Sequence, residues 1–411
     1  MSDYIPYELT IEILARLPVV SLLRFKSACK SWYSLIVSPS FVTKHLNHRK
    51  YMHFIGLYNR DDQKERYFIF RDDEQCGHKC SELEFPYKVP SLYYSMIVGS
   101  CNGLLCMWED SSWEESAIIV WNPSMRKLVT LPEPPSSGIC ALGFGAHPAT
   151  HEYKVVRIVC QSYPYQHEFQ PHVELYTQGT GSWRGLGSTF PLYCFIPYKA
   201  SQAFVSGAVN WIAEDPRVSV GYQHLIVSFD MSTETFSTMM LPPALADRET
   251  RFLSVTLFRE SLAMLCGQQR DKGDCSIWLM KEYGVPISWT KLFSFKLNQP
   301  VYPKRTLWFM KQNEVLVSTI DKRLLSYDIG TKASVDTGIR GLPSSFHVMN
   351  HNEVLLSTID KRLLSYDIGT KASVDTRMWG FPSSFHVQPF VESLVVVENK
   401  NGVVDWQLNP L

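Results

Sequence analysis

The chain has 411 residues, which is enough for two or three domains of roughly 100–200 residues each. The 40 basic and 40 acidic side chains cancel, so no overall charge would attract nucleic acid or an anionic membrane. Apolar residues make up 45% and charged residues 19% of the chain, which excludes global disorder and supplies a large core. Because the apolar runs are far shorter than the roughly 18 residues of a membrane span, we expect no such span.

The ten cysteines indicate a reducing compartment. They are spread through a chain that is too large to need a disulfide framework, and several lie in apolar runs, where a buried free thiol is the simpler interpretation. The chain begins without a basic segment followed by an apolar one, so we expect no signal peptide. The predicted location is the cytoplasm, with the nucleus as a second compartment.

Residues 1–50 differ from the rest of the chain in charge and in pattern. They contain seven Lys or Arg and three acids, a net charge of +4, so the other 361 residues carry 33 bases and 37 acids, a net charge of −4. An apolar stripe with helical spacing runs from Leu9 to Leu17, and Pro18 ends that helix. Ser21 and Ser38 are the predicted N-caps of later helices. Three or four short helices make a small core that usually needs a partner.

This first segment resembles an F-box from end to end. The matching positions read Ile5-Pro6-x-Glu8-Leu9-x-x-Glu12-Ile13-Leu14-x-Arg16-Leu17-Pro18-x-x-Ser21-Leu22-Leu23-Arg24-Phe25-Lys26-x-x-Cys29-Lys30-x-Trp32-x-x-Leu35-Ile36-x-x-Pro39-x-Phe41. The resemblance implies a small all-α F-box domain over residues 1–48.

The F-box resemblance also implies a partner and a set of contacts. An F-box binds a Skp-type adaptor, which joins it to a cullin and a RING protein in an SCF ubiquitin ligase. The adaptor-binding residues carried over by position are mostly apolar, and they are Pro6, Ile13, Leu14, Leu17, Pro18, Leu22, Leu23, Arg24, Phe25 and Lys30. For each apolar residue the alternative is that it only closes the helical core. The basic side chains of the second helix suit an acidic partner.

From residue 51 the pattern changes to short apolar strands bounded by turn residues. Asn102-Gly103 predicts a tight hairpin. A strand that ends in an aromatic residue or Leu then recurs, with anchors at 121, 176, 229, 279 and 327 that are 55, 53, 50 and 48 residues apart. A period near 50 residues predicts a kelch-like β-propeller with one four-stranded blade per unit. Two stacked β-sandwiches are the alternative.

The β region resembles the plant F-box-associated interaction domain. The segments that carry the resemblance include Cys101-Asn102-Gly103-Leu104-Leu105-Cys106, Trp121-Asn122-Pro123-Ser124, Gly181-Ser182-Trp183-Arg184 and Ser228-Phe229-Asp230-Met231. The match is most similar to the S-locus F-box group. It implies a target-binding domain over residues 51–411, and a target-recognition subunit of an SCF ubiquitin ligase. Membership of the S-locus group would imply a role in self-incompatibility, with a basic stylar ribonuclease as the target.

Residues 313–348 and 352–387 are near copies, 39 residues apart, and 31 of their 36 positions are identical. Because a propeller has a fixed number of places, either both copies enter the ring or one lies outside it. The sequence does not decide between the two arrangements. A unit of 39 residues is short for a blade, and we favour the second.

No motif in the chain predicts catalysis, a metal or a cofactor. Cys76, His78 and Cys80 are only half of a zinc site. His167 and His172 have the wrong spacing for a zinc-binding helix, and a proline separates them. The glycine pairs at 143/145 and 179/181 lack the third glycine of a dinucleotide loop and are predicted to be turns. We therefore predict no catalytic residues, no metal and no cofactor.

The target surface is predicted from long connections between strands, which are residues 72–84, 109–115, 161–172 and 214–224. In the second of these, Glu109, Asp110, Glu114 and Glu115 surround Trp113, so we predict an acidic rim around an aromatic anchor. The alternative is a solvated loop. Two other functions compete with the target receptor: a propeller enzyme, and a scaffold that binds proteins without ubiquitin chemistry.

Overall fold

A computed structural model describes most of the chain, with gaps mainly in the connections. The described residues are 5–48, 52–59, 64–71, 79–83, 85, 95–110, 116–160, 171–187, 190–191, 194–197, 200, 202–215, 223–246, 253–258, 260–266, 275–295, 307–309, 314–318, 323–328, 331, 333–340, 346–348, 353–357, 362–367, 372–379, 386–397 and 404–405.

Residues 5–48 form a helical module. Its elements are α1 (Tyr7–Ala15), α2 (Val19–Phe25), α3 (Lys30–Ile36) and α4 (Pro39–Asn47). The predicted cap of the last helix is confirmed, because Ser38 Oγ accepts a hydrogen bond from Phe41 N at 3.3 Å. The prediction for the second helix is wrong: α2 begins at Val19 with Pro18 in the N-cap position, and Ser21 lies within the helix.

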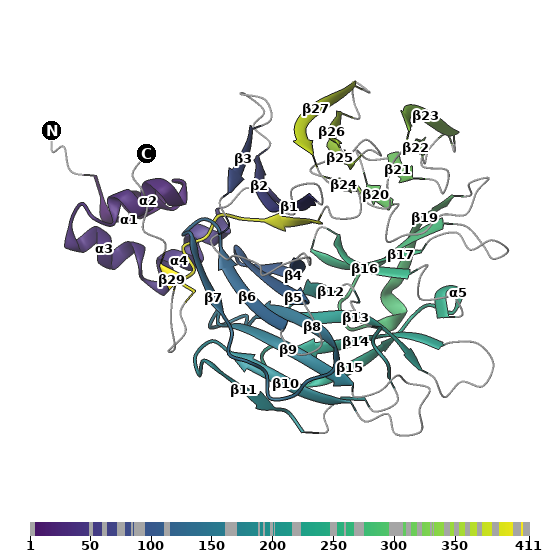
Figure 1. The fold of residues 1–411 in the computed structure, drawn as a ribbon, viewed down its shortest axis with the longest axis horizontal. Coiled ribbons are helices and arrows are strands. Elements are labelled where there is room, and N and C mark those ends of the chain that lie inside the picture. The colour runs from purple at the N-terminus through teal and green to yellow at the C-terminus, as the bar shows by residue number, and fades with distance from the viewer. Residues whose placement is uncertain are drawn as a thin grey trace.

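The strands that the structure describes form seven sheets, which are the blades of a β-propeller (Figure 1). Blade 1 contains β28 (His386–Phe390), β1 (Met52–Asn59), β2 (Lys64–Arg71) and β3 (Lys79–Leu83). Blade 2 contains β4 (Ser95–Cys101), β5 (Leu104–Asp110), β6 (Ser116–Asn122), β7 (Lys127–Thr130) and β29 (Val404–Asp405). Blade 3 contains β8 (Ile139–Ala146), β9 (Tyr153–Cys160), β10 (His172–Thr177) and β11 (Ser182–Gly185).

The other four blades follow in chain order, each as an antiparallel sheet of four strands. Blade 4 contains β12 (Gln202–Val205), β13 (Ala208–Asp215), β14 (Gln223–Asp230) and β15 (Phe236–Met240), and the short helix α5 (Pro243–Ala246) follows it. Blade 5 contains β16 (Leu253–Phe258), β17 (Ser261–Cys266), β18 (Cys275–Met280) and β19 (Trp289–Phe295), with the 3₁₀ turn η2 (Pro286–Ser288) between the last two. Blade 6 contains β20 (Leu307–Phe309), β21 (Glu314–Ser318), β22 (Arg323–Asp328) and β23 (Ala333–Arg340). Blade 7 contains β24 (Phe346–Val348), β25 (Glu353–Ser357), β26 (Arg362–Asp367) and β27 (Ala372–Trp379).

Blade 1 joins the two ends of the propeller. The late strand β28 pairs antiparallel with the early strand β1, and Phe54 lies opposite Gln388. This pairing gives the first blade its innermost strand and removes an open sheet edge. The buried side chains form clusters between neighbouring blades, such as the one in which Phe144 of blade 3 packs with Val120 of blade 2.

The predicted repeat is confirmed strand by strand. The anchors Trp121, Tyr176, Phe229, Leu279 and Tyr327 all lie in the third strand of their blades, from β6 to β22. Each repeat of about 50 residues in the sequence therefore corresponds to one blade, and the alternative of two stacked β-sandwiches is wrong.

The predicted hairpin at Asn102-Gly103 is also confirmed. Asn102 has φ 50° and Gly103 has φ 76°, so both residues adopt the left-handed conformation that a two-residue hairpin needs. The glycines at 143 and 145 differ from the prediction, because they lie within β8 and not in a turn. A Cβ atom on Gly143 would overlap the Trp211 ring of blade 4, so this glycine permits close packing of two blades.

Both copies of the 39-residue duplication enter the ring, so the arrangement we favoured from the sequence is wrong. The first copy supplies β21, β22 and β23 of blade 6 and then β24, the first strand of blade 7. The second copy supplies β25, β26 and β27 of blade 7 and then β28, the first strand of blade 1. Each copy therefore equals one blade in length but is offset by one strand, so the second copy ends on the strand that closes the ring.

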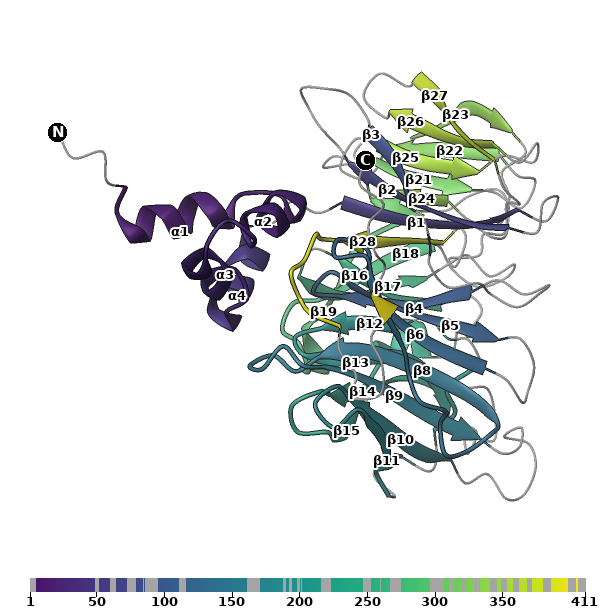
Figure 2. The same cartoon turned by 60° about the vertical axis from the view of Figure 1, so that its left-hand side comes forward.

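The helical module lies at one face of the propeller (Figure 2). This face carries the turn after the first strand and the turn after the third strand of blades 2 to 4, as in residues 102–103 and 123–126 of blade 2. Because the strands are antiparallel, the connections between second and third strands leave from the opposite face. Three of the predicted target loops, at 109–115, 161–172 and 214–224, begin and end at that opposite face. The fourth, at 72–84, includes β3 and follows the end of β2 on the module's side.

Candidate adaptor-binding surface

The helical module carries most of the exposed apolar side chains of the described residues. Eleven large apolar side chains are exposed, and seven of them lie between residues 5 and 37. They are Ile5, Tyr7, Leu9, Ile13, Val20, Tyr33 and Val37. A soluble surface rarely gathers apolar residues in this way unless a partner covers them.

Two pairs on this surface share a helical face. Leu9 and Ile13 are four residues apart on α1 and are 53% and 52% exposed. Tyr33 and Val37 have the same spacing along α3 and its C-cap. Side chains at this spacing lie one above the other, so each pair presents a short apolar ridge to solvent.

The structure places the predicted adaptor contacts in three classes. The exposed ones are Pro6, Ile13, Pro18, Arg24 and Lys30. The half-buried ones, Leu17, Leu23 and Phe25, pack against the core of the module.

Leu14 and Leu22 belong to the core and not to the surface. Their exposed fractions are 3% and 0%, and both pack in one buried cluster with Phe41. The F-box resemblance did not separate them from Ile13, because adjacent residues of an apolar stripe lie on either side of the boundary between core and solvent. These two positions therefore cannot touch a partner unless the module changes shape.

The predicted contacts leave out several apolar residues that the structure exposes on the module, among them Ile5, Tyr7, Leu9 and Val20. Leu9 belongs to the apolar stripe of the first predicted helix, and the others lie where the amphipathic pattern is weak. A signal was present in the sequence, since residues 4–9 contain four large apolar side chains around the start of a short helix.

The Leu17-Pro18 corner is held by a buried histidine. His45 has no exposed surface, and its Nε2 lies 3.1 Å from the carbonyl oxygen of Leu17. The imidazole stacks on Phe41 with the ring centres 6.1 Å apart. This contact fixes the end of α1 against α4, so the exposed side chains of α1 have a defined position.

Charges surround the apolar surface. Arg24 and Lys30 are exposed, and Lys26 Nζ lies 5.0 Å from the centre of the Tyr33 ring. Glu12 pairs with Lys44, and the hydrogen bond from Lys44 lowers the pKa of this carboxyl group below 4.5. Because the charge of Glu12 is balanced by that of Lys44, the surface near α2 and α3 is basic, which suits an acidic partner.

The predicted acidic rim is only partly within the described residues. Glu109 lies in β5 and is 2% exposed, so it is buried in blade 2 and does not form part of an exposed rim. Asp110 is the last residue of β5. Trp113, Glu114 and Glu115 lie outside the described residues.

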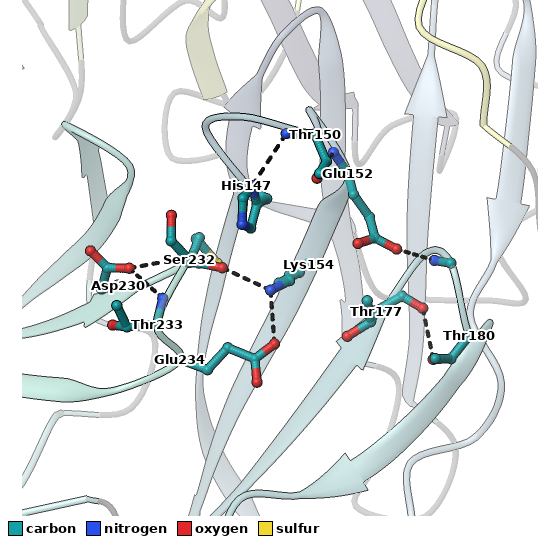
Figure 3. Close-up of polar contacts among 12 residues, drawn as sticks. His147, Thr150, Glu152, Lys154, Thr177, Thr180, Asp230, Ser232, Thr233 and Glu234 are labelled. Atoms are coloured by element: carbon teal, nitrogen blue, oxygen red, sulfur yellow. Dashed lines mark hydrogen bonds and ion pairs between the residues drawn. The ribbon is translucent and has the colours of Figure 1, made fainter.

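A buried lysine joins blades 3 and 4 on the face that carries the helical module (Figure 3). Lys154 is 4% exposed, and its Nζ donates hydrogen bonds to Met231 O at 2.7 Å and to Glu234 Oε1 at 2.8 Å. Arg184 also donates to Glu234. Burial alone would raise the pKa of Glu234, but the hydrogen bonds from Lys154 and Arg184 lower it below 4.5.

The turns beside this lysine are closed by their own side chains (Figure 3). Asp230 Oδ1 accepts hydrogen bonds from Ser232 N at 2.7 Å and Thr233 N at 2.8 Å, and His147 Nδ1 accepts one from Thr150 N at 3.2 Å. The polar groups at these turns therefore bond within the chain, and these bonds hold the turns in shape.

Within the described part of the chain, no group of three or more His, Cys, Asp or Glu is arranged to hold a metal ion. Of the three residues that resemble half of a zinc site, Cys80 lies in β3, while Cys76 and His78 lie outside the described residues. His167 also lies outside them, and His172 begins β10. None of the described helices is long and apolar enough to cross a membrane.

The fold and the surface together define a β-propeller protein with an N-terminal helical docking module. Residues 74–397 match the F-box associated beta propeller domain, and residues 3–44 match the F-box domain. The chain therefore belongs to the family of F-box proteins with an F-box-associated β-propeller.

Curated relatives from Arabidopsis thaliana agree with this assignment. An F-box/kelch-repeat protein is 29% identical over 309 residues, which cover 71% of this chain and 79% of the relative. The F-box protein CPR1 is 26% identical over 372 residues, which cover 83% of this chain and 86% of the relative. F-box/WD-40 repeat-containing protein 1 is 28% identical over 303 residues, with 71% and 68% covered.

Proposed function

We propose that the protein is the target-recognition subunit of an SCF-type ubiquitin ligase. The helical module binds a Skp-type adaptor, which connects it to a cullin and a RING protein, and the propeller captures a protein target. The observation that carries the proposal is the concentration of exposed apolar side chains on the module, which leaves an unburied surface for a partner. The chain acts by proximity: it raises the effective concentration of target lysines near the ubiquitin-conjugating enzyme and does no chemistry itself.

The proposed target surface is the propeller face opposite the helical module. Connections at 109–115, 161–172 and 214–224 begin and end there, and loops on a rigid scaffold are the usual place for binding residues. A target held at this face and an adaptor held at the other would lie on opposite sides of one rigid body.

Two narrower hypotheses accompany the proposal. The first is a role in self-incompatibility with a basic stylar ribonuclease as the target, which rests on the resemblance to the S-locus group alone. The second is a cytoplasmic or nuclear location, which is supported by the free thiols of Cys29, Cys101 and Cys106.

Reconstitution tests the proposal. A target is first captured from plant extract on the full chain while the proteasome is blocked, and is then incubated with the full chain, purified adaptor, cullin, RING protein, conjugating enzyme and ubiquitin. We expect ubiquitin transfer to the captured protein with the natural chain and none with the Ile13→Asp variant. Equal transfer with both chains would overturn the proposal, as would turnover of a small substrate by the propeller. If the adaptor does not bind the natural chain, the result would favour the alternative of a scaffold that binds proteins without ubiquitin chemistry.

A further inference from the structure

The segment that follows the closing strand β28, residues 391–397, lies between the helical module and the propeller. We call it the C-terminal strap. It runs on the propeller face that carries the module (Figure 2). The chain then returns to blade 2, where β29 pairs with β7.

The propeller holds the strap through side-chain amides. Asn122 is fully buried, and its Nδ2 donates hydrogen bonds to Ser393 O at 3.1 Å and Val395 O at 2.8 Å. Gln178 Nε2 donates to Val396 O at 3.1 Å. Val395 and Val397 are buried in the cluster between blades 2 and 3. One edge of the strap is therefore anchored to two blades.

The helical module uses the other side of the strap. Leu394 is 4% exposed and belongs to the buried core of the module, together with Leu14, Val19 and Leu22. The four helices do not close this core by themselves, because a leucine from the far end of the sequence fills part of it.

The strap also supplies the missing cap of α2. Pro18 occupies the N-cap position and has no side-chain oxygen to accept a hydrogen bond. The Glu392 carboxylate accepts one from Val19 N at 3.2 Å, although the two residues are 373 positions apart. Glu392 thus satisfies one of the free N–H groups of the first helical turn, where a negative charge is also favourable.

From these contacts we infer that the strap makes the helical module and the propeller one rigid unit, and that Leu394 and Glu392 are positioning residues for ubiquitin transfer. They fix the direction of the adaptor-bound module relative to the propeller. The inference rests on the proposed function for its link to transfer, whereas the structural coupling stands apart from it. The module also contacts the propeller directly, because Val42 and Leu46 of α4 pack against the cluster between blades 2 and 3, and Met125 of blade 2 packs against the module's core. To these surface contacts the strap adds a leucine inside the module's core and a cap on α2.

Hydrogen–deuterium exchange on the full chain tests the coupling. The test variant is Leu394→Ala, and the control is the same change at an exposed position, Leu292→Ala on β19, where the leucine is 39% exposed. We expect the amides of α2 to exchange at least about tenfold faster in Leu394→Ala and at an unchanged rate in the control. Equal exchange of α2 in both variants would overturn the coupling.

The pattern of self-modification tests the positioning. In the reconstituted ligase without a target, the probe is ubiquitin transfer to the chain's own propeller lysines, mapped by mass spectrometry. The natural chain should be modified at a restricted set of lysines, Leu394→Ala at a broader set, and Leu394→Met at the restricted set again. An unchanged set in Leu394→Ala would refute the positioning role. If the natural chain is not modified at all, the proposed function fails, and the exchange experiment still decides the coupling.

Discussion

Asn122 offers the sharpest test of how the propeller holds the helical module. Its side chain has no exposed surface and makes four hydrogen bonds. Two are donated to the strap carbonyls, and Oδ1 accepts the other two from Ser124 N at 2.9 Å and Met125 N at 3.1 Å. At a net value of about 0.5–1.5 kcal/mol each, the four bonds contribute roughly 2–6 kcal/mol. We therefore expect Asn122→Ala to lower the free energy of unfolding by about 3 kcal/mol.

Asn210 is a matched control in blade 4. It is equally buried, its Nδ2 donates to Ala203 O and Ala208 O at 3.1 Å, and its Oδ1 accepts from Tyr283 OH at 2.9 Å. Asn210→Ala should therefore cost a similar amount of stability, measured by urea unfolding with linear extrapolation.

The two variants should differ in the helical module. Hydrogen exchange of α2 should accelerate in Asn122→Ala, because the strap loses its anchor, and should stay unchanged in Asn210→Ala. If both variants are destabilised to the same extent and neither alters the exchange of α2, the strap does not transmit the state of the propeller to the module, and the reasoning is refuted.

Three further predictions follow from pKa values, burial and the duplication. The folded-state pKa of Glu234 lies below 4.5, so its contribution to the free energy of unfolding is present above that pH and is lost as the pH falls. Glu234→Gln lacks this contribution at every pH. In urea titrations its free energy of unfolding should therefore fall less between pH 5 and pH 3 than that of the natural chain. Cys29 is exposed and its hydrogen bond with Ser31 lowers its pKa, whereas burial raises the pKa of Cys101 to about 12. Iodoacetamide at pH 7 should therefore label Cys29 faster than Cys101. Equal labelling rates would contradict the burial of Cys101. Deletion of residues 349–387 should remove one blade and leave a closing strand, so the shortened chain should still unfold cooperatively, whereas deletion of residues 349–368 alone should leave unpaired edges and an insoluble chain.

Local patterns were enough to predict much of the fold. The hairpin at Asn102-Gly103 needs only two residues with positive φ, and the Ser38 cap needs only a serine ahead of a proline. The anchors at third strands follow from a repeated alternation of apolar and turn residues. Each of these features is decided within a few residues of the chain, so the local sequence is enough to predict it.

The features that the sequence did not predict depend on contacts between distant residues. Leu14 and Leu22 are buried in a core that Leu394 completes, so the boundary between core and surface depends on the C-terminal strap. The start of α2 at Val19 is stabilised by Glu392, which no local pattern reveals. The place of the duplication depends on ring closure, since its second copy ends on the strand that pairs with β1.

The candidate adaptor-binding surface also has a part that local sequence predicts and a part that it does not. The F-box resemblance predicted both Ile13 and Leu14 as contacts and could not tell which of the two is exposed, because neighbours on a helix are about 100° apart and both belong to the apolar stripe. The exposure of Ile13, at 52%, makes it a cleaner probe than Leu17, whose half-buried side chain also packs against the core.

The most direct measurement of the central claim is calorimetric titration of a purified Skp-type adaptor into the full chain and two variants. Ile13→Asp places a charge on the exposed apolar surface of the module, and Ile287→Asp makes the same change at an isoleucine of the propeller that is 93% exposed. We expect the natural chain and Ile287→Asp to bind equally well and Ile13→Asp to bind at least about a hundredfold more weakly, which corresponds to roughly 3 kcal/mol. Equal affinity of all three chains, or no binding by the natural chain, would contradict the account.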